Sequence, residues 1–446
     1  MTAGGKWLLI PVEVQVRELL SRLLVAVIAA ERGYRVLIGH DRVIRRLAPH
    51  LPKGILLDKG LGMTGDRKVA RYHRLGYRIA CIDEEMTGIY PNPEYFLRTR
   101  LSADTLSKAD RWFAISDKAR DLAVAEYPDF VDRFVTTGLP RTDIWQPRFH
   151  GLYAAERDAI RARHGRFILF CSNFGQIVHA RRGAFVDKQL ARHNKGYGKA
   201  DEYNARIEQQ LAANLEAFIA MLPKLRSWFP GHRLVVRPHP VESREFWQQA
   251  LAGIEGAQVD GEGIATPMIL SADALVHHGC MTGLEAEIMG VPQVMYAPHP
   301  DDHHDTELMA AIAPVVRTEA ALRKALAAML KTGRRKGPPP RAVEEWFAAQ
   351  TGALASERIL AELDKLPSRG GDLPGYLRLL RFTPRQLWAE HGIRSAKAAA
   401  YARQKWQDTN LAELQGKVAA LAHGAGISAA PRVAEVFPQL FEIAKA

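Results

Sequence analysis

Polar groups that could bind phosphate directly follow an apolar, strand-like run near the middle of the chain. The run "RLVVR" ends at Arg237 and continues into Pro238-His239-Pro240, where two prolines restrain the backbone around one histidine. Open parallel sheets bind ligands at the carboxyl ends of their strands, so this imidazole could donate to a phosphate oxygen while Arg237 adds charge. A proline turn with an ordinary surface histidine fits the same residues, and this stretch alone leaves both interpretations open.

A second candidate follows the buried run "ADALVHH". In "GCMTGLEAEIMGVP", Gly279 and Gly283 flank the start of an expected helix, and Thr282 is placed to cap it. Free N–H groups at such a helix end bind phosphate, and Glu285, one turn in, could accept hydrogen bonds from a ribose. The alternative is an ordinary capped helix with Glu285 favoured by the helix dipole. We expect both stretches to converge on one phosphate-sized space.

Three successive acids, Asp83, Glu84 and Glu85, follow another buried strand in "CIDEEMTG". Crowding of like charges raises one carboxyl pKa into a range useful for a general base, and a carboxylate can also act as a nucleophile. A solvated acidic turn is the plain alternative. The position at a strand end, opposite the expected phosphate site, favours catalysis.

Two other clusters of polar residues are weaker candidates for a functional site. The run "APHPDDHHD", residues 297–305, contains histidines and aspartates, but its spacing matches no specific metal site. Cys280 beside His278 has no obvious third partner for nucleophilic catalysis. We therefore expect neither a metal nor a cofactor.

The elements that must position these residues read as two α/β domains. Strand-like and helical stretches alternate through residues 1–150 and again through residues 151–335, as in parallel sheets. The segment "GRRKGPPPRA" reads as a linker, and residues 343–446 as a helical extension. The expected fold is α/β and GT-B-like: two Rossmann-like, doubly wound domains facing a cleft that holds the ligand.

The composition indicates which classes of binding partner to expect. The 446 residues carry a net charge of +12, which favours anionic partners, and three scattered cysteines fit a reducing cytosol. No RNP motif, zinc finger or heptad array is present, so nucleic acid is not an expected partner. The apolar run from Leu19 to Ala30 contains Arg22 and is too short to span a bilayer. With no signal-peptide pattern, we expect a cytoplasmic protein, with peripheral contact to the anionic inner membrane as a further expectation.

The motifs together resemble a known family. "IPVEVQVRELLSRLLVAVIAAERGYRVLIG", "CIDEEMTG", "TTGLPRTDIW", "CSNFG", "VVRPHP" and "HGCMTGLEAEIMGVP" look like the bacterial surface carbohydrate biosynthesis proteins. These are similar to Kdo transferases and, more distantly, to bacterial sialyl- and polysialyltransferases. The resemblance covers roughly residues 6–330.

The resemblance implies a GT-B glycosyltransferase with its active site between two Rossmann-like domains. The acidic motif supplies the catalytic carboxylate, the His-Pro motif holds the phosphate of a CMP-sugar, and the later segment places Thr282 near phosphate and Glu285 near the ribose. Residue by residue, the motifs correspond to Asp83, Glu84 and Glu85, to His239 and Pro240 beside Arg237, and to His278, Gly279, Thr282, Gly283 and Glu285.

This sequence departs from the family pattern twice. Met86 and Thr87 intervene before Gly88, where the acidic motif normally reaches its glycine sooner. Gly279-Cys280-Met281 stands where the family tends to have Asn-Ser-Thr, so two hydroxyls are lost from the phosphate turn.

These observations predict an enzyme that transfers a sugar, such as Kdo or a related ulosonic acid, from a CMP-sugar donor to a glycan or glycolipid acceptor. No metal is required where basic side chains and helix N-termini neutralise the leaving phosphate. Three alternatives remain open: a nucleotide-sugar epimerase, a glycerophosphotransferase of the same fold, and a non-catalytic nucleotide-sugar-binding assembly subunit.

Overall fold

The chain forms two compact α/β units. The first contains Met1–Met86, Leu97–Leu152 and Glu345–Ala446, and the second contains Thr87–Phe96 and Tyr153–Glu344. This confirms the prediction of two Rossmann-like domains, but the chain after residue 344 returns to the first unit. The computed structural model describes residues 6–61, 66–84, 93–179, 200–300, 304–367, 406 and 409–446.

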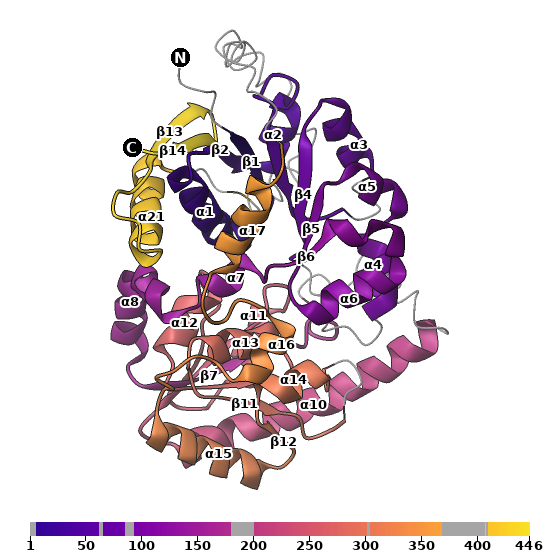
Figure 1. Ribbon diagram of the computed structural model, residues 1–446. Helices are drawn as coiled ribbons and strands as arrows, with labels where there is room; N and C mark the ends of the chain where they lie inside the picture. The colour runs from indigo at the N-terminus through magenta and orange to yellow at the C-terminus, as the bar shows by residue number, and fades with distance from the viewer. Residues whose placement is uncertain are drawn as a thin grey trace. The chain divides into compact units, whose positions relative to one another are not determined.

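The sheet of the first unit has the order β13-β14-β2-β1-β3-β4-β5-β6 (Figure 1). The strands β1 to β6 pair in parallel. Because β2 and β3 lie on opposite sides of β1, the chain reverses direction there, and β1 and β3 flank the topological switch point. The strands are β1 (Trp7–Val12), β2 (Arg35–His40), β3 (Ile55–Asp58), β4 (Arg78–Ile82), β5 (Arg111–Ala114) and β6 (Phe134–Thr136).

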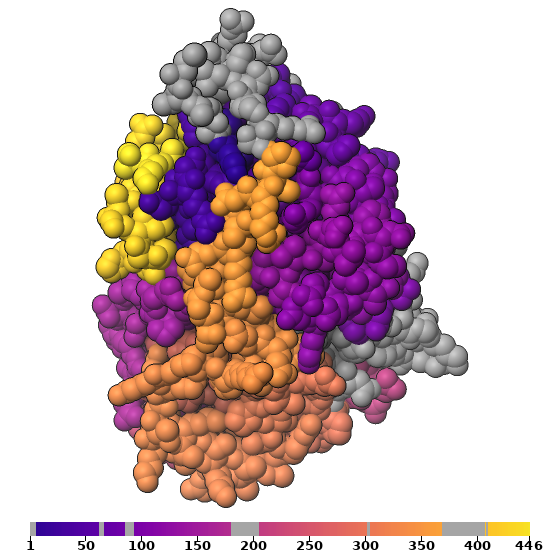
Figure 2. Space-filling view, viewed as in Figure 1, coloured from indigo at the N-terminus to yellow at the C-terminus, as the bar shows by residue number. Residues whose placement is uncertain are grey.

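Helix α1 (Gln15–Glu31) is covered on more than one side. It contacts β1 and β2 as well as α17 (Ala355–Asp364) and α21 (Leu411–Gly424). In Figure 2, α17 in orange and α21 in yellow lie on either side of the indigo N-terminal segment. This packing explains the nearly continuous apolar run of α1, because burial leaves no side for polar residues. None of the described helices is long and apolar enough to cross a membrane.

Other helices connect the strands. Before residue 154 they are α2 (Asp41–Leu47), α3 (Asp66–Arg74), α4 (Pro93–Arg100), α5 (Ala103–Lys108), α6 (Asp117–Glu126), α7 (Pro140–Asp143), and the 3-10 helices η3 (Pro128–Arg133) and η4 (Pro147–Tyr153). After it they are α8 (Ala154–His164), α10 (Ala200–Trp228), α11 (Arg244–Ala250), α12 (Ala265–Ser271), α13 (Met281–Ile288), α14 (Glu307–Ile312), α15 (Glu319–Thr332) and α16 (Arg341–Trp346).

A buried carboxylate fastens the returning segment. Asp143, on α7, accepts hydrogen bonds from the backbone N–H groups of Ala355 and Ser356, both at 2.9 Å, and from the Ser356 hydroxyl at 2.7 Å. These donors lie at the N-terminus of α17, where a negative charge is favourable. Complete burial raises the pKa of Asp143 to about 7, and the three hydrogen bonds oppose the rise.

The last residues correct the expectation that residues 343–446 are a helical extension. They end in a hairpin of β13 (Arg432–Phe437) and β14 (Leu440–Ala444), and β14 pairs antiparallel with β2. At Gly39 of β2, an added Cβ would lie 2.4 Å from the carbonyl oxygen of Gln439. Pairing between residues about 400 positions apart is not visible in local sequence patterns.

The second unit has one parallel sheet in the order β12-β11-β10-β7-β8-β9. Its first strand, β7, lies between β8 and β10, so the switch point falls between β7 and β10. Phe170, Phe174, Phe218 and Trp247 form an aromatic core against this sheet. The strands are β7 (Phe167–Cys171), β8 (Arg233–Arg237), β9 (Ala257–Val259), β10 (Ala274–His277), β11 (Gln293–Tyr296) and β12 (Val315–Val316).

Candidate functional site

The loops that follow β7 and β10 are joined at the switch point of the second unit. Cys171, the last residue of β7, lies opposite Arg237 of β8 on one side and His277 of β10 on the other. The side-chain amide of Asn173 donates to the carbonyl oxygens of His278 and Gly279, each at 3.4 Å. The structure thus brings the two motifs predicted from sequence to one edge of one sheet.

His239 is held through its backbone and its ring. Its backbone N–H donates to Ser172 Oγ at 3.2 Å, and its exposed ring accepts at Nδ1 from the backbone N–H of Val241 at 3.4 Å. Desolvation and the nearby His179 lower the pKa of His239. The lowered pKa favours the neutral ring, and because Nδ1 accepts a hydrogen bond, the proton of that ring lies on Nε2, which makes no hydrogen bond to a described residue.

Glu242 supports the histidine and was missed from the sequence. Its buried carboxylate accepts from the Phe174 backbone N–H at 2.6 Å, the Trp247 indole at 2.8 Å, the His239 backbone N–H at 3.3 Å and the Ser172 hydroxyl. Burial raises the pKa of Glu242, and these donors oppose the rise. The available signal was an acid three residues after the histidine in "HPVE".

The structure corrects the expected role of Arg237. Its guanidinium donates to the carbonyl oxygens of Glu262 at 2.9 Å and Gly263 at 2.5 Å. These residues belong to the loop after β9, and the side chain is largely buried. Arg237 therefore anchors a loop instead of adding its charge beside His239. Pro240 lies exposed next to the histidine, as expected for a restrained turn.

The start of α13 also differs from the expectation. Cys280 is the N-cap residue and makes no side-chain capping bond, whereas Thr282 lies inside the first turn with its hydroxyl on the Cys280 sulfur. Thr282 therefore does not cap the helix. Gly279 has a φ of +55°, and a Cβ there would lie 2.5 Å from the Cβ of His304. This glycine is required by the backbone.

Two further residues of this motif are explained by packing. A Cβ on Gly283 would lie 2.5 Å from Nε2 of the buried His277, which contacts Gln293 Oε1 at 2.9 Å. The His278 ring is fully buried and stacks on Phe174 with centroids 5.0 Å apart. The resemblance implied a donor-binding role for His278, but this ring lies in the core and does not face a ligand directly.

Glu285 is buried and Cys280 is half-buried. The carboxylate of Glu285 is buried and accepts a hydrogen bond from the Thr266 hydroxyl. A ribose contact with Glu285 stays a prediction that this geometry does not test. Burial raises the pKa of the Cys280 thiol, which disfavours the thiolate that a nucleophile needs.

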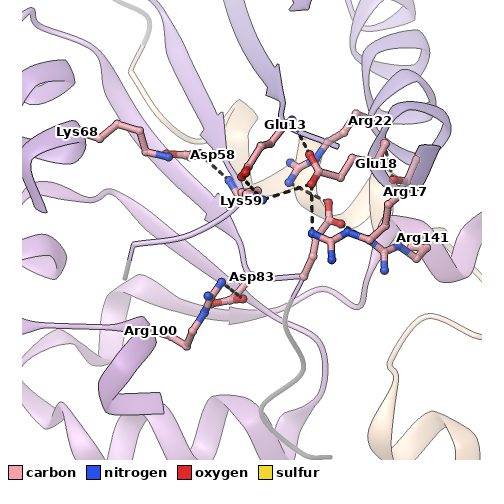
Figure 3. A network of polar contacts seen from close by, with 12 residues as sticks. Glu13, Arg17, Glu18, Arg22, Asp58, Lys59, Lys68, Asp83, Arg100 and Arg141 are labelled. Atoms are coloured by element: carbon pink, nitrogen blue, oxygen red, sulfur yellow. Dashed lines mark hydrogen bonds and ion pairs between the residues drawn. The ribbon is translucent and has the colours of Figure 1, made fainter. Parts of the chain in front are cut away.

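The acidic motif lies at the carboxyl edge of the first unit's sheet, inside a network of ion pairs (Figure 3). Asp83 forms a bidentate pair with Arg100, with both N···O distances at 2.9 Å. Glu84 lies between Arg22, at 2.9 Å, and Arg141. Both acids are largely buried, so neither forms part of a solvated turn. Glu85 lies outside the described residues.

The network continues to the ends of β1 and β3. The buried Glu18 accepts from the Glu13 backbone N–H at 2.8 Å and pairs with Lys59 at 3.3 Å and Arg17 at 3.4 Å. Burial opposes ionisation, but Lys59 and the hydrogen bond lower the pKa of Glu18 overall. Sequence reasoning missed these residues, because their partners are distant along the chain.

The described residues contain no group of three or more His, Cys, Asp or Glu side chains that could hold a metal ion. Residues 301–303, from the histidine- and aspartate-rich run, lie outside the described part of the chain.

No family model and no curated protein matches the sequence. Solved structures do share the fold. The UDP-GlcNAc 2-epimerase from Methanocaldococcus jannaschii is 13% identical, with a TM-score of 0.51 over 80% of this chain and 99% of that chain.

Two other similar structures have lower scores. The Neisseria meningitidis UDP-GlcNAc 2-epimerase bound to UDP-GlcNAc is 11% identical, with a TM-score of 0.48 over 81% of this chain and 100% of that chain. The wall teichoic acid polymerase TagF is 12% identical, with a TM-score of 0.43 over 81% and 89%. The likeness to the Methanocaldococcus enzyme, at 13% identity and a TM-score of 0.51, shows the fold alone: the chain has a GT-B-like fold of two Rossmann-like units.

Proposed function

We propose that this protein is a nucleotide-sugar enzyme of cell-surface carbohydrate synthesis, and specifically a glycosyltransferase. In this proposal it transfers a sugar, such as Kdo or a related ulosonic acid, from a CMP-sugar to a glycan or lipid-linked acceptor. The observation that carries the proposal is the placement of His239. Its neutral ring is fixed at Nδ1, which leaves Nε2–H as a donor at the carboxyl edge of a doubly wound sheet.

The neighbouring loops support a phosphate at this edge. Helix α13 begins at Cys280, and the positive end of its dipole favours an anion at this edge, although the Gly283 N–H already donates to the Cys280 carbonyl oxygen at 3.0 Å. Asn173 ties the loop after β7 to the loop that leads into this helix. A neutral imidazole donor and a helix N-terminus together can hold a leaving phosphate without a cation.

The acidic motif supplies the second half of the proposal. Asp83 and Glu84 are fixed by arginines at the carboxyl edge of the other sheet. Ion pairing suits carboxylates that orient a substrate or stabilise positive charge developing on a sugar. A free base with a pKa near 7 would need a different environment.

Product analysis tests the proposal. The purified protein is incubated separately with CMP-Kdo, UDP-GlcNAc and CDP-glycerol, with and without a lipid-linked glycan acceptor, and released nucleotide is quantified. We expect CMP release from CMP-Kdo, stimulated by acceptor. Absence of both hydrolysis and transfer with CMP-sugars would sink the transferase proposal.

An epimerase is the second candidate, and the fold likeness to the Methanocaldococcus enzyme favours it. An epimerase would convert UDP-GlcNAc to its C2 epimer without an acceptor. Conversion of UDP-GlcNAc in the same assay therefore assigns the epimerase. Thermal protection by CMP or UDP with no turnover of any substrate assigns the non-catalytic binding subunit.

A further inference from the structure

Much of the excess positive charge lies in two segments of the first unit that contain the helices α2 and α3. Residues 41–53 and 66–78 contain nine lysines and arginines against two aspartates, a surplus of seven within a whole-chain surplus of twelve. These residues include α2 and α3. Lys68 and Arg78 turn inward to Asp58 and Asp110, so the outer faces carry the rest.

Five arginines define this surface, here called the α2–α3 basic face. Arg42, Arg67 and Arg74 are exposed, and Arg45 and Arg71 are partly exposed. None of the five forms an ion pair with a described residue. Arg42 and Arg46, like Arg67 and Arg71, are four residues apart, where like charges destabilise a helix. These like-charge pairs cost helix stability, whereas Arg45, Arg71 and Arg74 lie in the last turns, where the helix dipole favours positive charge.

The two helices lie on the same side of the sheet. The connections β2–α2–β3 and β3–α3–β4 run in one direction across the sheet, and right-handed crossovers place both helices on one face. Lys68, in the first turn of α3, pairs with Asp58 at the end of β3, and it opposes the rise that burial causes in the pKa of Asp41, the first residue of α2. Both helices begin at the carboxyl edge, where Asp83 and Glu84 lie.

We propose that the α2–α3 basic face docks the protein on an anionic lipid bilayer. The charge is spread along two helices, which suits a surface, and bilayers with anionic lipid attract such arginines. Nucleic acid fits less well, because the tyrosines of these segments, Tyr72 and Tyr77, are buried and leave no aromatic ring to stack on bases. Docking through this face would keep the protein at the membrane surface, where lipid-linked acceptors reside.

Vesicle co-sedimentation tests the docking surface independently of catalysis. The full chain is mixed with phosphatidylcholine vesicles that contain either no anionic lipid or about one-third phosphatidylglycerol. We expect binding only to the anionic vesicles. An arginine near such a surface changes partitioning about fivefold, equivalent to about 1 kcal/mol. The triple variant Arg42→Gln, Arg67→Gln and Arg74→Gln should therefore bind roughly 100-fold more weakly.

Matched variants test whether vesicle binding depends on where the positive charges lie and on the charge itself. Arg323→Gln, Lys324→Gln and Lys331→Gln remove three exposed charges from α15 and should leave vesicle binding unchanged. Arg42→Lys, Arg67→Lys and Arg74→Lys preserve charge and should retain binding. Raising salt from about 0.1 M to 1 M shortens the Debye length from about 10 to about 3 Å and should release the protein.

Three results would overturn the inference. One is undiminished vesicle binding by the first triple variant, with unaltered thermal unfolding. The second is an equal loss in the α15 variant. The third is displacement from anionic vesicles by equimolar single-stranded RNA, which would assign the basic face to nucleic acid. None of these results depends on which sugar nucleotide the protein uses.

Discussion

Oε2 of the buried Glu242 accepts a hydrogen bond from the backbone N–H of His239 at 3.3 Å. The same carboxylate accepts from the Trp247 indole in the aromatic core, so the histidine turn is anchored to the interior of its unit. The prolines on either side restrain the backbone, and Glu242 sets where that restrained turn lies.

The ring of His239 should contribute directly to nucleotide binding. His239→Ala should weaken CMP binding by about 10- to 100-fold, since hydrogen bonds to charged groups contribute about 1.5–3 kcal/mol. Calorimetric titration measures the affinity, and thermal unfolding should be unchanged because the ring is exposed. An affinity equal to that of the unaltered protein would remove His239 from the nucleotide site.

We expect Glu242 to affect nucleotide binding by holding the His239 turn in place. Glu242→Gln places an amide N–H₂ where four donors converge, so we expect a loss of about 1–3 kcal/mol in the free energy of unfolding and weaker CMP binding. Denaturant titration measures the first quantity. Glu245→Gln, three residues on and exposed, is the control and should change neither. Equal behaviour of the two variants would contradict the anchoring role.

Stability and catalysis should be separable at Glu84. Glu84→Gln leaves the fully buried Arg22 without its ion-pair partner, which typically costs about 3–5 kcal/mol. Adding Arg22→Met removes the buried charge and should recover most of the loss. If Glu84 acts on substrate, the double variant is stable and inactive; recovered turnover would show that Glu84 is structural.

An exposed ion pair provides a reference value for the loss of stability in that experiment. Asp104→Asn breaks an exposed pair with Lys108 within one helix, where exposed ion pairs contribute at most about 1 kcal/mol. A loss of the same size in Glu84→Gln and Asp104→Asn would contradict the buried network.

Glycine at position 283 should be required by packing. In Gly283→Ala the new methyl lies 2.5 Å from Nε2 of His277, so we expect destabilisation of about 1–3 kcal/mol. Gly416→Ala, in the exposed face of α21 with open space around it, is the matched control and should stabilise by up to about 1 kcal/mol. Thermal unfolding of both variants decides whether the contact with His277 is real.

Asp143 should make stability depend on pH. Its pKa is about 7 in the folded protein and near 4 when unfolded, so the folded state holds the proton more tightly. This contribution is complete below about pH 4 and is lost as pH rises to about 7. The difference in unfolding free energy between the unaltered protein and Asp143→Asn should therefore fall with pH across that window and level off above it. A difference that rises with pH would mean that the helix N–H groups keep Asp143 ionised.

Much of the architecture was predictable because its signals are local. Apolar runs of strand length alternate with amphipathic helices, and this pattern alone specifies parallel α/β units. The same locality identified the strand ends that carry Asp83, His239 and Gly279. The hairpin β13–β14 escaped prediction because its partner, β2, lies about 400 residues away, and no local pattern records such pairing.

The sequence by itself determined that a histidine, an acidic motif and a glycine-flanked helix follow buried strands, because period and composition are properties of the chain. Only the tertiary structure decided where those side chains point. Arg237 turns to the carbonyls of Glu262 and Gly263, and Glu242 lies beneath His239. Burial selects such partners, since a charge removed from water must find whatever groups the fold brings within hydrogen-bond distance.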